Sequence, residues 1–384
     1  MRHITALLLL VLMTTACGDD STQDAADSSA LTALSNPDTA GYARAHAPRD
    51  FTFPADDGPH PDFKTEWWYW TGNLTAEDGR RFGYQFTIFR NALAPDLPPG
   101  NADSADWRSR QLYFAHFALS DIDGGRFHAF ERFSRGAAGL AGAQATPFHV
   151  WVEDWQANGT PDSVRIVAEE NSIGIDLTLI AAKERVLQGN RGLSRKSAAA
   201  GNASYYYSRT RLSTRGALRS GSETIDVTGL SWLDREWSTS VLSRQQSGWD
   251  WFSLQFDDGS EVMLYQLRLE GGEADTTSSG IIVAPDGSTR RLAYGDFEIR
   301  AREEWTSPHS GITWPSGWDV ILRPWDTVLR VTPLQRDQEL RLAVTYWEGA
   351  VEVTAPGRRG RGYVELTGYG LRSAQKARPA PSTR

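Results

Sequence analysis

The chain has 384 residues, of which 40% are hydrophobic and 23% charged, and its net charge is -8. This length exceeds what one hydrophobic core usually serves, so we expect two domains, and the ordinary composition excludes a globally disordered protein. The negative charge argues against a nucleic-acid partner, because phosphate binding depends on clustered Lys and Arg. Fifteen Trp, fifteen Phe and twelve Tyr against three Met favour β-sheets, since aromatic rings suit a pleated, half-buried surface.

The N-terminus, residues 1–17, is typical of a bacterial lipoprotein signal peptide. Arg2 supplies a positive charge, residues 6–13 are apolar, and small residues lead to Cys17, the only cysteine. The apolar run is too short to span a bilayer, so we expect a lipid on Cys17 to anchor the protein in the cell envelope, facing the periplasm. Gly18 favours the outer membrane. The alternative is an ordinary secretory signal with an incidental free cysteine.

The remaining chain divides into four predicted parts. Residues 18–48 are rich in Asp, Ser, Thr and Ala, which predicts a disordered tether. Residues 49–240 and 241–375 are the two expected folded domains, and residues 376–384 form a disordered tail.

Past the tether, apolar and polar residues alternate with period two, and almost no segment sustains the period of a helix. We therefore predict an all-β fold of short strands and tight turns, arranged as barrels or sandwiches. The predicted strands of the first half are 66–74, 82–90, 111–120, 127–133, 148–155 and 173–180. Those of the second half are 249–256, 261–269, 281–284, 288–294, 341–347 and 361–369.

Two predicted hairpins, one in each half, resemble each other. The first runs from an aromatic strand at 67–70 through Asp-Gly at 78–79, and the second from an aromatic strand at 249–252 through Asp-Gly at 258–259. Asp-Gly is a strong hairpin signal. The similarity favours two related domains, although two hairpins of a β-rich chain can also resemble each other by chance.

The first aromatic strand carries rings on both of its faces. Alternate side chains of a strand share a face, so Trp67 and Tyr69 point one way while Trp68 and Trp70 point the other. Such a strand needs a cover on both sides, one being its own core. The other cover is either the second domain alone or an elongated apolar ligand in a barrel mouth or groove.

Three carboxylates stand beside tryptophans. The segment 229–237, Gly-Leu-Ser-Trp-Leu-Asp-Arg-Glu-Trp, contains Asp234 and Glu236, which are candidates for a general acid with a raised pKa. A structural ion pair with Arg235 is the simpler interpretation. Asp250, between two further tryptophans, is the third candidate acid, unless it faces water. No metal-ligand spacing, nucleophile elbow or nucleotide motif occurs, so we expect no metal or cofactor.

Long aromatic motifs carry a family resemblance. They are His-Pro-Asp-Phe-Lys-Thr-Glu-Trp-Trp-Tyr-Trp-Thr-Gly at 60–72, Trp-Leu-Asp-Arg-Glu-Trp at 232–237, and Gly-Trp-Asp-Trp-Phe at 248–252 with Leu-Tyr-Gln-Leu at 264–267. Residues 51–371 resemble the carotenoid 1,2-hydratase (hydroxyneurosporene synthase) and AttH-like family. The resemblance implies two tandem lipocalin-like β-barrel domains and an apolar ligand such as an isoprenoid, a carotenoid or a fatty acyl chain.

The resemblance also implies a chemistry. Enzymatic members protonate a carbon–carbon double bond with an acid, and water quenches the carbocation, so an enzyme of this kind is a hydro-lyase. Aromatic faces stabilise cations, a role that suits Tyr265 and the tryptophans. Together with Trp67, Trp68 and Trp70, the expected ligand-binding residues are Trp237, Trp249 and Trp251.

The chain departs from the hydratase branch at two positions. That branch has a His before the Trp that matches Trp237 and an Asp two residues after the Tyr that matches Tyr265. This chain has Arg235 and Leu267 there. Activity would then depend on another acid, for which the candidates are Asp234, Glu236 and Asp250.

The sequence is compatible with three functions. The leading expectation is an envelope lipoprotein that binds a hydrophobic ligand in a Trp-rich barrel cavity or domain interface. The first alternative is a hydratase that adds water to an isoprenoid double bond. The second is a carbohydrate-binding or carbohydrate-active β protein, because paired carboxylates and stacking Trp also suit sugars.

Overall fold

The computed structural model describes residues 39–95, 110–160, 162–239 and 242–370. Cys17, its predicted lipid and the predicted 376–384 tail lie outside these residues. Within them the named elements are strands and two short 3₁₀ turns, η1 (Ala55–Asp57) and η2 (Arg323–Trp325), so the all-β prediction is confirmed. The described ranges contain no helix that is long and apolar enough to cross a membrane.

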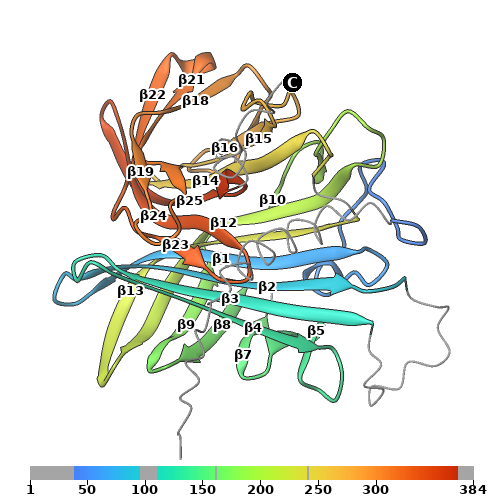
Figure 1. Cartoon of the computed structure of the whole chain (residues 1–384), viewed down its shortest axis with the longest axis horizontal. Helices are drawn as coiled ribbons and strands as arrows, with labels where there is room; N and C mark the ends of the chain where they lie inside the picture. Colours follow the sequence, from blue (N-terminus) through green and yellow to red (C-terminus); the bar gives the residue numbers. More distant parts are fainter. Residues whose placement is uncertain (1–38, 96–109, 161, 240–241, 371–384) are drawn as a thin grey trace, which may run out of the picture.

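Thirteen strands form the first sheet, and every pairing in it is antiparallel (Figure 1). Its main path, in spatial order, is β4 (Arg126–Arg135), β3 (Gln111–Asp121), β2 (Arg81–Ala92), β1 (Thr65–Ala76), β13 (Glu223–Ser238), β12 (Ala203–Ser220), β9 (Ile173–Ala181), β8 (Ser163–Glu170), β7 (Trp155–Thr160), β6 (Phe148–Val152) and β5 (Ala141–Gln144). Two short strands also pair with β12, namely β10 (Val186–Leu187) and β11 (Leu193–Arg195).

Ten strands form the second sheet, again antiparallel. Its path is β17 (Thr289–Leu292), β16 (Ser279–Val283), β15 (Glu261–Leu269), β14 (Gln246–Phe256), β25 (Arg358–Leu366), β24 (Thr345–Ala355), β22 (Thr327–Pro333), β21 (Trp318–Leu322) and β18 (Phe297–Ala301), and β23 (Glu339–Arg341) pairs with β24. A separate two-stranded sheet consists of β19 (Glu304–Thr306) and β20 (Thr313–Pro315).

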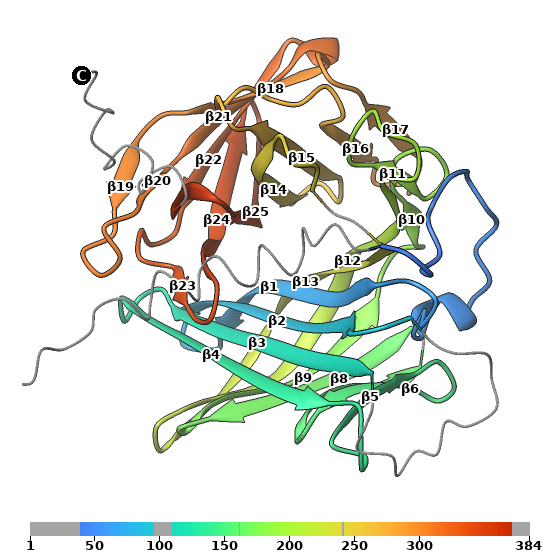
Figure 2. The ribbon, with the colours of Figure 1, turned by 45° about the vertical axis from the view of Figure 1, so that its right-hand side comes forward.

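Each large sheet curls into a nearly closed barrel, and the two barrels lie one against the other (Figure 2). The expectation of two barrels is confirmed. Side chains fill both interiors: Trp70, Phe117 and Trp155 lie in the first barrel, and Trp318 and Trp347 lie in the second. The chain passes from one barrel to the other between β13 and β14.

Most predicted strands exist, and both Asp-Gly hairpins are confirmed as β1–β2 and β14–β15. Two predicted strands were wrong because each contains a turn. The segment 148–155 is β6, a turn and the first residue of β7, and the segment 341–347 is the end of β23, a turn and the start of β24. The long hairpin β12–β13 was absent from the predicted strands.

The outer walls of the barrels meet in a buried interface. Tyr69 of β1 packs edge-to-face on Trp251 of β14, with ring centroids 5.1 Å apart. Gly83 of β2 permits the approach, because a Cβ atom there would lie 2.6 Å from the Cβ of Ala350 on β24. Glu261 of β15 is completely buried and pairs with Lys183, at 2.8 Å, and with Arg211 of the first barrel. The two barrels therefore share one polar and aromatic core.

A second buried network joins the motifs at 60–72 and 232–237. Glu66 of β1 is completely buried and pairs with Arg90 and Arg235. Burial alone would raise the pKa of Glu66, but the two guanidinium charges outweigh it and hold the pKa well below its usual value. His60 stacks on Trp237, with centroids 3.7 Å apart. Arg235 is thus part of the framework of the first barrel.

Replacing Glu66 with Gln leaves two buried guanidinium groups without their shared counter-charge. We expect this to lower the free energy of unfolding by about 3 to 5 kcal/mol, the usual cost of breaking a buried ion pair from one side. Urea denaturation measures the difference. The control is Asp176→Asn, which removes the exposed pair with Arg165 and should cost at most about 1 kcal/mol. Equal losses in the two variants would contradict the assignment.

Candidate functional site

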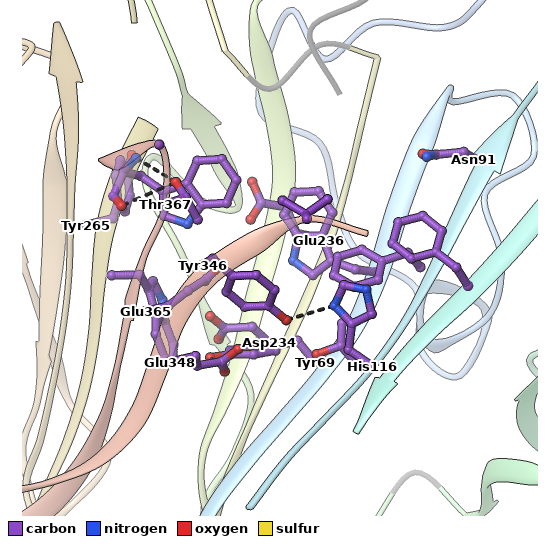
Figure 3. A pocket seen from close by; sticks show the side chains of 18 of the residues that line it. Tyr69, Asn91, His116, Asp234, Glu236, Tyr265, Tyr346, Glu348, Glu365 and Thr367 are labelled. Atoms are coloured by element: carbon purple, nitrogen blue, oxygen red, sulfur yellow. Dashed lines mark hydrogen bonds between the residues drawn. The ribbon is translucent and has the colours of Figure 1, made fainter. Parts of the chain in front are cut away.

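A cavity of about 410 Å³ lies between the two barrels and is lined by residues of both (Figure 3). The first barrel contributes residues from β1, β2, β3, β4, β12 and β13, and the second contributes residues from β14, β15, β24 and β25. The volume falls within the range of small-molecule sites in proteins. The cavity is therefore outside both barrels, at their interface.

Aromatic rings form most of the apolar wall. Phe89 of β2 and Phe114 of β3 stack with centroids 4.5 Å apart and planes 12° apart. Phe133 of β4 continues the stack, lines the cavity and is 49% exposed, so it marks the opening to solvent. Trp67 and Trp249 also line the cavity. Flat or elongated apolar molecules fit such a wall.

Asp234 of β13 lines the cavity and is 3% exposed. Its carboxyl accepts hydrogen bonds from the hydroxyl of Tyr206, from Ser208 Oγ at 2.5 Å and from Trp232 Nε1 at 2.7 Å. Burial outweighs these donors and raises the pKa of Asp234 to about 7. Near neutral pH this carboxyl can hold a proton and release it, as a general acid must.

Glu236, two residues further on the same face, has a different environment. Lys196, from the segment between β11 and β12, places its Nζ 2.7 Å from the Glu236 carboxylate. Burial alone would lower the pKa of Lys196, but the charge of Glu236 outweighs it and the pKa is raised. Glu236 and Lys196 thus form an ion pair at the cavity wall, which makes Glu236 a poorer candidate acid than Asp234.

The second barrel adds two carboxyl groups, Glu348 of β24 and Glu365 of β25. Tyr69 donates a hydrogen bond from its hydroxyl to Glu348. Burial, followed by the charge of Glu365, raises the pKa of Glu348 well above its usual value. Burial also raises the pKa of Glu365 to about 7. The cavity therefore contains acidic groups on both sides.

His116 of β3 and Tyr346 of β24 join the two barrels beside these acids. Nδ1 of His116 and the hydroxyl of Tyr346 are 2.8 Å apart (Figure 3). Burial lowers the pKa of His116 to about 3, so the imidazole is neutral at physiological pH. Within the described ranges, no group of three or more His, Cys, Asp and Glu residues is arranged to hold a metal ion.

The structure places the predicted site residues in two groups. The cavity lining includes Asp234, Glu236, Tyr265, Trp67, Trp249 and Trp251. The others lie elsewhere. Trp68 and Trp70 belong to the core of the first barrel, and Trp237 packs beneath the segment that precedes β1. Asp250 pairs with Arg268 and accepts a hydrogen bond from Tyr369 at 3.1 Å.

The two positions that depart from the hydratase branch also separate. Leu267 lines the cavity, whereas Arg235 is completely buried against Trp68 and Glu66. Several polar lining residues were not selected from the sequence as site residues, among them His116, Tyr346, Glu348 and Glu365. One signal was available, because Glu348 follows Tyr346 and Trp347 and so is a carboxylate next to aromatic residues, as Asp234 is.

Fold and site together define a class of protein: two antiparallel barrels in tandem with an aromatic, acidic cavity between their outer walls. The sequence profile of the AttH-like family matches residues 44–369, and the chain belongs to that family. No curated protein matches the sequence.

Solved structures share this fold, and one of them also supports the family. A Nitrosomonas europaea protein described as an AttH is 34% identical, with a TM-score of 0.77, over 85% of this chain and 99% of its own. Kievitone hydratase from Nectria haematococca is 14% identical, with a TM-score of 0.64, over 85% of this chain and 96% of its own. CghA, solved with Sch210972, is 14% identical with a TM-score of 0.51 over the same shares. The last two likenesses concern the fold alone.

The raised pKa of Asp234 predicts a pH dependence of stability. Between its usual value of 3.8 and about 7, the folded protein holds a proton that the unfolded chain has released. Stability therefore falls as pH rises through this window, by up to about 1.4 kcal/mol per pH unit for this proton. Asp234→Asn should remove this contribution and flatten the curve of unfolding free energy against pH.

Urea denaturation at several pH values across the window measures the effect. Asp176→Asn is the matched control. Exposed Asp176 accepts a hydrogen bond from Arg165, which lowers its pKa, so this carboxyl group titrates below the window. Its curve should run parallel to that of the wild type. A parallel curve for Asp234→Asn would show that Asp234 is not protonated in the folded state.

Proposed function

We propose that the protein is an enzyme of the hydratase type, which binds an apolar unsaturated molecule between its barrels and protonates a carbon–carbon double bond with Asp234. One observation carries the proposal: Asp234 is a buried carboxyl, with a pKa of about 7, in a cavity lined mainly by aromatic and aliphatic side chains. An isoprenoid is the substrate class that the family resemblance implies.

The chemistry follows from the surroundings of Asp234. Transfer of its proton to one carbon of the double bond leaves a carbocation on the other, and the faces of nearby aromatic rings stabilise such a charge by about 0.5 to 2 kcal/mol each. Trp251 and Tyr265 lie in the cavity wall and supply such rings. Water then adds to the cation. The fold likeness to kievitone hydratase, a protein named for hydration, supports this class of reaction.

A second candidate function is binding and transport without chemistry. Leu267 favours it, because this apolar side chain lines the cavity at the position where the hydratase branch has an Asp. The carbohydrate alternative has less support. A sugar needs polar partners for its hydroxyl groups, whereas the stacked Phe89, Phe114 and Phe133 offer none.

We further propose that the protein works at the cell envelope, attached through a lipid on Cys17 and facing the periplasm. The apolar run at 6–13 and the small residues before Cys17 support this location. A lipid anchor would hold the cavity close to a membrane in which apolar ligands dissolve.

The enzymatic proposal predicts a gain of water. The purified protein is incubated with a membrane lipid and isoprenoid extract, and mass spectrometry identifies bound and altered species. We expect a species heavier by one water, and Asp234→Asn should lower its rate of formation by roughly 100-fold or more, the usual contribution of a general acid. Asp176→Asn is the surface control. A bound molecule of unchanged mass would support transport, and an empty protein would contradict both functions.

The location proposal predicts acylation. Cells that express the full chain and are fed an alkyne-bearing fatty acid should attach it to the wild-type protein, and Cys17→Ala should abolish the label and release the protein from the membrane fraction. The cavity lies far along the chain from Cys17, so ligand binding should be equal in the two proteins. Labelling of the Cys17→Ala variant would contradict the anchor.

A further inference from the structure

Glu348 and Glu365 are direct neighbours on the second barrel. They are cross-strand partners in the register of β24 and β25, and both line the cavity. Side chains directly opposite one another in an antiparallel pair have Cβ atoms about 4.5 to 5.5 Å apart. The fold thus places two carboxyl groups side by side, on the wall that faces Asp234 of the first barrel.

The pair lacks a counter-charge among the described residues. The described part of the chain places no Lys, Arg or His within ion-pair distance of either carboxyl group, in contrast to Glu236, which has Lys196. Glu348 is 1% exposed, and it accepts hydrogen bonds from the hydroxyls of Tyr69 and Tyr346. Glu365 accepts a hydrogen bond from the indole of Trp249.

Two adjacent carboxylates in a desolvated site cannot both ionise easily, so the pair retains a proton. Burial and the neighbouring charge of Glu365 raise the pKa of Glu348 well above its usual value. The pair therefore keeps a proton at a higher pH than an isolated glutamate does. Such a pair can accept one further proton, and it presents an acceptor oxygen to a water molecule in the cavity.

We propose that Glu348 and Glu365 are the base of the reaction: together they hold the water that adds to the ligand and take its proton. The inference rests on the proposed hydration. The acid and the base then come from different barrels, with the ligand between them.

The proposed addition of water conserves atoms and charge. The π electrons of the double bond take the proton of Asp234, whose O–H bond breaks. The water oxygen forms a bond to the resulting cationic carbon, and its O–H bond breaks as the proton moves to the Glu348–Glu365 pair. Return of that proton to Asp234 restores the site. The net reaction converts an alkene and water to an alcohol, and the reverse path eliminates water.

Labelled water separates the roles of acid and base. The purified protein is incubated with farnesol, squalene and lycopene in deuterated water or in water enriched in heavy oxygen. The wild type should place deuterium on carbon and heavy oxygen in the alcohol. Asp234→Asn should do neither, because no carbocation forms.

The base variants should behave differently. In Glu348→Gln and Glu365→Gln the carbocation still forms and can return its proton to Asp234. The recovered alkene should therefore gain deuterium, while heavy-oxygen incorporation falls by roughly 100-fold or more. Glu352→Gln is the matched control, an exposed glutamate on the same strand as Glu348. Heavy-oxygen incorporation at the wild-type rate, or loss of both labels, would overturn the assignment of the base.

A titration tests the pair without activity. Carbon NMR of protein labelled in its glutamate carboxyls follows Glu348, and Glu365→Gln should lower the pKa of Glu348 because it removes the adjacent charge. The other titratable groups that line the cavity, Asp234, Glu236, Lys196, Tyr69, His116, Tyr206, Tyr265 and Tyr346, are common to both proteins. An unchanged titration of Glu348 would show that the two carboxyl groups do not share a proton.

The titration and the labelling can also give different results. If the titration shifts but the wild type incorporates neither label, the pair stands as a proton-sharing site, and the hydratase function fails together with the role of the pair as base.

Discussion

The contact between the outer walls of the two barrels is the constraint on which the rest of the structure depends. Tyr69 and Trp251 pack against each other there, and Glu261 of one barrel is fully buried by Lys183 and Arg211 of the other. Separating the barrels would expose these groups to water, and the cavity, which both barrels line, would no longer exist. The geometry of the site is therefore a property of the interface, since both barrel interiors are filled with side chains.

In the first barrel, the neighbouring groups decide what each buried carboxyl group can do. Glu66 is as buried as any residue, yet two guanidinium groups keep its pKa low. Asp234 has only neutral donors, and its pKa is raised to about 7. Glu236 lies two residues beyond Asp234 on the same strand and forms an ion pair with Lys196. Burial alone would not distinguish these three carboxyl groups, so the position of the nearest cation decides which of them can act as an acid.

Local pattern was enough to predict much of the fold. The alternation at 67–70 correctly separated the core-facing Trp68 and Trp70 from Trp67, and Asp-Gly marked both hairpins. The hairpin β12–β13 was missed because arginines such as Arg209 and Arg211 interrupt the apolar alternation of β12. Arg209 pairs with Asp162 and Arg211 pairs with Glu261, and both partners are distant in the sequence.

The site needed information that a single segment does not contain. Glu348 and Glu365 become a pair only through the register of β24 and β25. Asp250 lies among tryptophans in the sequence, as Asp234 does, but its strand turns it away from the cavity toward Arg268. The family resemblance supplied the two-barrel fold, and the sequence profile supports it; no resemblance assigned the acids of the second barrel.

The two aromatic hairpins also bear on how such a chain can change. Tyr69 and Trp251 come from the corresponding strand of each hairpin and meet at the cavity, much as identical patches meet across the axis of a two-fold dimer. In a true dimer any substitution appears on both sides at once. Here each half is encoded separately, so one side can acquire a lone acid and the other a carboxyl pair. A tandem chain can therefore build an asymmetric cavity between its halves, whereas a cavity on the two-fold axis of a dimer is symmetric.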